Sequence, residues 1–70
     1  MARDALIHRV NPYLLHGEQY YEIFYSYANE PDSIRQSRIA HTNIYSDPQA
    51  GDQVLIEAVL NVIMEIKKKG

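Results

Sequence analysis

The sequence predicts an all-β domain, either a small SH3-like or OB-like barrel or a strongly bent antiparallel sheet. Turn-forming residues divide the 70-residue chain into pieces of about strand length, and those pieces are rich in aromatic and β-branched residues. The last third also alternates apolar residues at a period of two. That segment fits a helical period as well. The alternative is therefore an α+β fold, an antiparallel sheet with one C-terminal helix over residues 48–68.

Clusters of turn-forming residues set the boundaries of the predicted elements. Proline fixes φ, glycine permits positive φ, and Asn or Asp side chains bond the local backbone, so each cluster favours a turn. No linker or internal repeat separates the pieces, which predicts one small domain over residues 1–70. The clusters are Asn11-Pro12, Gly17, Asn29–Asp32 and Asp47–Asp52.

The first two pieces differ in how clearly they predict strands. Ala5–Val10 fits a strand but also a frayed helical turn. Gln19–Tyr27 is the clearest strand, because aromatic and β-branched residues suit a pleated, half-buried surface. Its odd positions, from Tyr21 to Tyr27, are apolar and are expected to face the core. The even positions, expected nearer to solvent, are Tyr20, Glu22, Phe24 and Ser26.

The third piece, Ser33 to Tyr45, begins ambiguously. Ser33 with Gln36 fits a capping box that opens one helical turn. Its later part, from Ile39 onward, contains Thr, Ile and Tyr and favours a strand. We expect this strand to be an antiparallel neighbour of Gln19–Tyr27.

The segment from Gly51 to Ile66 decides the fold class. For a helix, Asp47 fits an N-cap, Pro48 the first helical position, and the terminal lysines complement the helix dipole. For a strand, the even positions are all apolar and β-branched residues are frequent. Most strands run about 5–6 residues, so a strand of this length is expected to bend or bulge, with Asn61 the expected place.

One resemblance favours the strand. Gly51-Asp-x-Val-Leu-Ile-x-Ala58, followed by Val62 and Ile66, resembles the closing strand of the small β-barrel chaperones of hydrogenase maturation. The resemblance implies a small barrel. It implies no activity, because that family works through a cysteine near its N-terminus and this chain contains none.

Composition and motifs exclude several functions. Without cysteine there is no disulfide or thiolate zinc site, and three scattered histidines predict no metal site. No nucleophile–base motif is present, so no catalytic residue and no cofactor are predicted. The net charge of −2 disfavours nucleic acid as a partner. No apolar run is long enough for a signal peptide or membrane span, which predicts a cytoplasmic protein without a membrane partner.

Association is the function that the sequence favours. A chain of this length buries only about 60% of its unfolded surface, so a partner is an expected source of stability. On the strand interpretation, Leu55, Val59 and Ile63 form an outward aliphatic stripe, to which Tyr20 and Phe24 add aromatic surface. We therefore expect a non-enzymatic protein-interaction module, a homo-oligomer or a small accessory subunit of a larger assembly.

Two other functions are compatible with the sequence. A small barrel that binds single-stranded nucleic acid would use the rings of Tyr20 and Phe24 for stacking. Arg35 and Arg38, with His41 nearby, are its candidate contacts for anions or nucleic acid. The remaining alternative is a small-ligand carrier, or an enzyme whose site lies at a subunit interface.

Overall fold

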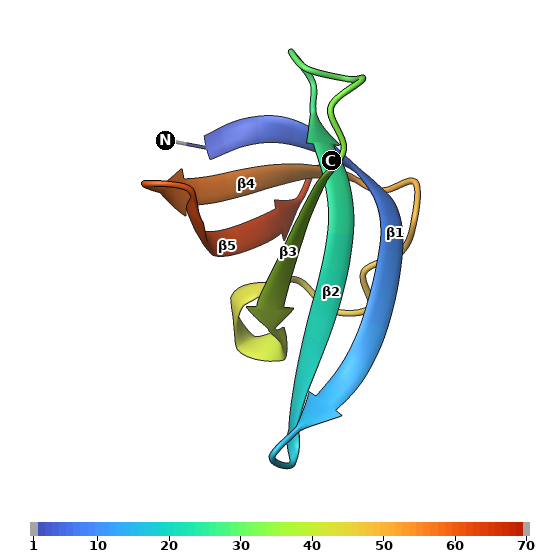
Figure 1. The fold of residues 1–70 in the computed structure, drawn as a ribbon, viewed down its shortest axis with the longest axis vertical. Coiled ribbons are helices and arrows are strands. Elements are labelled where there is room, and N and C mark those ends of the chain that lie inside the picture. Colours follow the sequence, from blue (N-terminus) through green and yellow to red (C-terminus); the bar gives the residue numbers. More distant parts are fainter. Residues whose placement is uncertain (1, 70) are drawn as a thin grey trace.

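The computed structural model describes residues 2–69, which form one antiparallel sheet in the order β3-β2-β1-β4-β5 (Figure 1). The all-β prediction is confirmed. The alternative helix over residues 48–68 is wrong, because that segment forms the last two strands. The elements are β1 Ala2–Leu15, β2 Glu18–Tyr27, β3 Arg35–Ala40, the short 3-10 helix η1 His41–Asn43, β4 Gln53–Val59 and β5 Val62–Lys68.

The central strand β1 is longer than the sequence indicates. It pairs with β2 over nearly its whole length but with β4 only through its first residues, Ala2 to Leu6. Pro12 therefore lies where β4 no longer borders β1, and a proline is tolerated at such an edge. A register shift between Ile7 and Arg9 marks a bulge in β1. This bulge adds local twist to a strand that already curves (Figure 1).

Two tight hairpin turns define the sheet. In both, the two loop residues have positive φ, the combination of a type I′ turn. The β1–β2 turn uses His16 and Gly17, with φ of 51° and 80°. The β4–β5 turn uses Leu60 and Asn61, with φ of 51° and 67°. The bend expected at Asn61 is thus a complete reversal, which makes two strands of the predicted single one.

The core lies on the concave face of the sheet. Ile23, Tyr25 and Tyr27 of β2 are buried there, as the odd face of that strand predicts. The sheet curves enough for Ile44, just after η1, to form a parallel bridge with Ile66 of β5. No ladder joins β3 to β5 within residues 2–69, so the sheet is not closed into a barrel. The buried apolar residues are Ala5, Ile7, Ile23, Tyr25, Tyr27, Ile39, Ile44, Val54, Ile56 and Ile66.

A hydrogen-bonded loop connects η1 to β4. The hydroxyl of Tyr45 donates to Oδ2 of Asp52 at 2.6 Å, and the backbone N–H of Gln49 donates to the same oxygen at 3.0 Å. The bond from Tyr45 and then that from Gln49 lower the pKa of Asp52 below its usual value. Burial, followed by the bond to Asp52, raises the pKa of Tyr45. These bonds fix the loop and so the position of β4.

Candidate functional site

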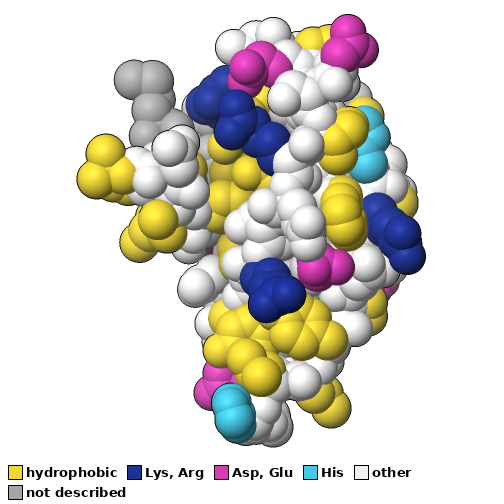
Figure 2. Space-filling view, viewed as in Figure 1, with side chains coloured by type: hydrophobic (Ala, Val, Ile, Leu, Met, Phe, Trp, Pro, Cys, Tyr) yellow, Lys and Arg dark blue, Asp and Glu magenta, His cyan; other side chains and the backbone are white. Residues whose placement is uncertain are grey.

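The free end of the β4–β5 hairpin is the most exposed apolar surface among the described residues. The relative exposure is 55% for Val59, 92% for Leu60, 60% for Val62 and 53% for Met64. We call these four residues the hairpin tip. In Figure 2, yellow side chains project at the left, where the β4–β5 turn lies in Figure 1. Contiguous exposed apolar surface of this kind is typical of an interaction site.

The turn and a bulge together decide which side chains face outward. Directly opposite residues share a face of the sheet, so Val59 and Val62 lie together on the outer face. Glu57 pairs with Glu65 and Ala58 pairs with Ile63, which leaves Met64 as the extra, bulged residue of β5. The two-residue turn is why Ile63 faces inward and packs against the core while Met64 is exposed, and the bulge then returns Ile66 to the core face.

The aliphatic stripe predicted from the sequence is divided by this geometry. Of its three residues, Val59 is exposed at the hairpin tip, Leu55 is half-buried on the outer face, and Ile63 is half-buried against the core. Leu60, Val62 and Met64 were assigned to the interior by the period of two. Asn61, which tolerates positive φ, is the weak sequence signal for a turn at this position.

The outer face of β1 and β2 carries a second feature, which we call the aromatic face: Tyr13, Tyr20 and Phe24. Tyr13 and Tyr20 pair across the strands, and their rings stack with centroids 5.7 Å apart and planes 22° apart. The guanidinium of Arg9 lies 5.9 Å from the centroid of Phe24. That of Arg38 lies 5.9 Å from the centroid of Tyr13. The sequence indicated Tyr20 and Phe24 but not Tyr13 or Arg9.

Glu22 lies in the middle of the aromatic face, and its carboxylate is the shared partner of three polar side chains around it. Its carboxylate accepts hydrogen bonds from Gln36 at 2.6 Å and from Asn11 at 3.3 Å. It also forms an ion pair with Arg38 at 3.9 Å. The hollow beside it, about 260 Å³, is lined by Asn11, Tyr13, Glu22 and Arg38. Because Glu22 and Arg38 both line this hollow and form an ion pair, their charges partly cancel there.

The structure does not bring the three candidate anion-binding residues together. Arg38 pairs with Glu22 on the outer face, whereas Arg35 pairs with Tyr25 and so belongs to the concave face. His41 is exposed at the start of η1. Residues three apart in a strand point to opposite sides, so Arg35 and Arg38 do not form one patch.

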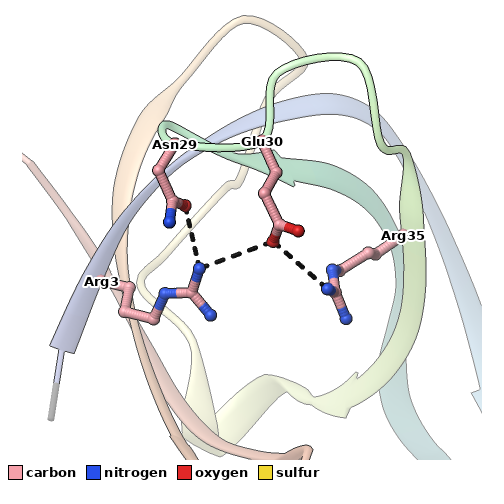
Figure 3. Close-up of polar contacts among 4 residues, drawn as sticks. All are labelled: Arg3, Asn29, Glu30 and Arg35. Carbon is pink, nitrogen blue, oxygen red and sulfur yellow. Dashed lines mark hydrogen bonds and ion pairs between the residues drawn. The ribbon is translucent and has the colours of Figure 1, made fainter.

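Arg35 instead belongs to a cluster at the end of the sheet near the β2–β3 loop (Figure 3). Oε1 of Glu30 lies 3.3 Å from a guanidinium nitrogen of Arg35 and 3.6 Å from one of Arg3. Arg3 also donates to the side chain of Asn29 at 2.9 Å and lies 3.7 Å from the centroid of Tyr27. Arg3 belongs to β1, Asn29 and Glu30 to the β2–β3 loop, and Arg35 to β3. The cluster therefore joins these three segments at the surface.

One contact resembles part of a catalytic arrangement. Oγ of Ser26 and Nε2 of His8 lie 2.8 Å apart. Ser26 is only 3% exposed, so this bond satisfies a buried hydroxyl rather than presenting it to a substrate. Within residues 2–69, no group of three His, Asp or Glu side chains is placed to hold a metal ion. The same residues include no helix long and apolar enough to cross a membrane.

Comparison with known proteins identifies no relative of this chain. No protein-family model matches it, and neither a curated protein nor a solved structure does. Its function therefore has to be inferred from the geometry of the described residues.

Proposed function

We propose that this chain is a non-enzymatic protein-interaction module that assembles with copies of itself through the hairpin tip. The main support is the conformation and exposure of Leu60. Its φ of 51° lies in the left-handed region, which costs a residue with a Cβ about 1–2 kcal/mol relative to glycine. Its side chain is also 92% exposed, so it gains nothing from burial in the single chain.

Leu60 is unfavourable for the single chain in two ways, through its positive φ and through its exposed apolar side chain. Asn or Gly are the residues that type I′ turns prefer, and either would relieve the strain. Such departures from local consistency are expected where a residue serves a contact outside its own fold. Burial of Leu60 in an assembly would supply the gain that the single chain lacks.

The neighbours of Leu60 support the same proposal. Val59, Val62 and Met64 are each more than half exposed and flank it on the same hairpin. No charged residue lies between Val59 and Met64 in the sequence. A small domain with little core benefits from covering such a surface, because each buried aliphatic side chain contributes about 1.5–3 kcal/mol.

The test compares the hairpin tip with a matched exposed leucine elsewhere. Leu60→Asn removes the apolar side chain and suits the turn, so the variant should stay folded. Leu14→Asn is the control, because Leu14 is 70% exposed near the other hairpin turn. In size-exclusion chromatography with light scattering, the wild type and the control should associate as concentration rises. Leu60→Asn should associate about tenfold more weakly. Equal association of both variants would contradict the proposal.

The accessory-subunit form of this proposal uses the same surface on a different partner. It predicts a chain that stays monomeric at every concentration and binds a larger assembly through the hairpin tip. The light-scattering experiment therefore separates the two forms, since only self-assembly raises the mass of the purified chain.

A second candidate function is binding of single-stranded nucleic acid, favoured by the aromatic face. Aromatic rings on an open sheet stack on unpaired bases, and Arg9 and Arg38 supply positive charge. The chain has six tyrosines and no tryptophan, so tyrosine fluorescence reports directly on ring stacking. Quenching by oligothymidylate that weakens with added salt would support this function. Fluorescence that does not respond to the oligonucleotide would exclude it.

A further inference from the structure

We infer that the partner of the hairpin tip is the same segment of a second copy, with the two β5 strands paired antiparallel about a two-fold axis at Ile63. This inference rests on the proposed self-assembly and names its geometry. β5 ends the sheet, and in residues 2–69 its outer side is bridged only at Ile66, by Ile44. The part from Val62 to Met64 is therefore an open edge.

The backbone of Ile63 is suitably directed for such pairing. In a two-residue hairpin, the residues beside the turn direct both backbone groups at each other. Here these residues are Val59 and Val62. By the alternation of an antiparallel ladder, the N–H and C=O of Ile63 are then directed away from β4. Two copies can exchange these groups as one hydrogen-bonded pair.

Few registers are sterically available to this edge. Centring the axis one residue later would put Met64, the bulged residue of β5, at the centre of the pairing. Centring it one residue earlier would place the turn residue Asn61, whose φ is 67°, opposite Ile63 of the other copy. The axis at Ile63 places Val62 of each copy opposite Met64 of the other.

The side chains fit this self-pairing. Val62 and Met64 are both exposed, and opposite each other they would form two apolar cross-strand pairs. Residues 62–64 carry no charge, so no two like charges face each other within this pairing. An interface formed by one patch on both copies is the arrangement of a closed two-fold dimer.

The other edge of the sheet is protected against such pairing. β3 carries Arg35 and Arg38, and charged side chains on an edge strand discourage association. Residues 62–64 of β5 carry no charge, and the bulge at Met64 limits this uncharged edge to the residues before Glu65. This contrast assigns the contact to β5 rather than to β3.

Disulfide trapping tests the register, because the chain contains no cysteine of its own. The single variants Val62→Cys and Met64→Cys are prepared, mixed and oxidised at a concentration where the wild type is associated. A non-hydrogen-bonded antiparallel pair has Cα atoms about 4.5 Å apart, within the range that disulfides span. Intact mass spectrometry distinguishes the mixed disulfide from the two homodimers, and circular dichroism checks the fold of each variant.

The inference predicts that the mixed disulfide forms about tenfold faster than either homodimer, because only unlike positions lie opposite each other. Leu14→Cys, on the other hairpin, should trap no faster than free diffusion allows. A statistical mixture of the three disulfides, in a chain that light scattering shows to associate, would overturn the register and leave the proposed function standing. A wild-type chain that stays monomeric would overturn both the register and self-assembly.

Discussion

Val59 and Val62 lie directly opposite each other across the β4–β5 hairpin, and more than half of each side chain is exposed. As a cross-strand pair they support the hairpin, with a contribution of about 0.2–1 kcal/mol. As exposed valines on a protruding end, they also form part of an unpaired apolar surface.

The double substitution Val59→Thr and Val62→Thr should separate these two roles. Threonine keeps the β-branch that suits a strand, so stability should change by about 0.5 kcal/mol or less. Association should weaken because the hydroxyls make the surface polar. Urea unfolding measured on dilute protein reports the first effect, and light scattering reports the second. A loss of stability larger than about 1 kcal/mol would mean that the valines serve the fold.

Replacement of Leu60 by glycine should raise the stability of the single chain. Leu60→Gly removes the strain of a left-handed leucine and should raise the free energy of unfolding by about 1 kcal/mol. Leu60→Ala is the matched control, because it removes the apolar side chain but keeps a Cβ at positive φ. Urea titrations at low concentration should show a gain for glycine only. Equal stability of the two variants would show that the turn is unstrained.

Tyr45→Phe should destabilise the fold at neutral pH, and its effect should fade in acid. It removes the hydroxyl that donates to Asp52 at 2.6 Å. That bond is the main cause of the lowered pKa of Asp52. A carboxyl with a lowered folded pKa stabilises the fold above its unfolded pKa, about 3.9, and loses this contribution as pH falls through the folded value.

The measurement for Tyr45→Phe is the urea midpoint as a function of pH. Tyr20→Phe is the control, since its hydroxyl makes only a long, exposed contact of 3.5 Å with Glu18. The two midpoints should differ at neutral pH and converge in acid. A difference that persists unchanged in acid would show that the Asp52 charge does not contribute.

Alkaline solution should destabilise the fold through Tyr25. Burial, reinforced by Tyr27, raises the pKa of Tyr25 to about 12. A group whose folded pKa is raised stabilises the fold below its unfolded pKa, about 10, and loses this contribution as pH rises through the folded value. The urea midpoint of the wild type should therefore fall above about pH 10, and that of Tyr25→Phe should fall less. Parallel curves would contradict this assignment.

The class of the fold and much of the core could be predicted from sequence, because the odd positions of β2 from Tyr21 to Tyr27 are all large and apolar. Tyr25 and Tyr27 are buried for that reason. The expectation that Ser26 lies nearer to solvent is wrong, since it is only 3% exposed. The length of β1 could not be predicted, since Asn11-Pro12 is typical of a turn. Whether that proline interrupts a strand depends on where the neighbouring strand ends, which is a property of the whole sheet.

The hairpin tip was missed for a related reason. The period of two continues through the turn, so Leu60, Val62 and Met64 stay in phase with buried residues such as Ile56. The two-residue turn moves Val62 and Met64 to the outer face, and the one-residue bulge then returns Ile66 to the core. Neither feature leaves a strong sequence signal. By contrast, the separation of Arg35 from Arg38 could be predicted, because residues three apart in a strand point to opposite faces of the sheet.

Nuclear magnetic resonance of the amide groups during dilution tests the central claim most directly. If the chain assembles through the hairpin tip, the amide signals of residues 59–65 around the β4–β5 turn should shift or broaden with concentration, and the other signals should not. Amides of the aromatic face, including Tyr13 and Tyr20, should not change. Spectra that are identical at all concentrations, or changes centred on the aromatic face, would contradict assembly through the hairpin tip.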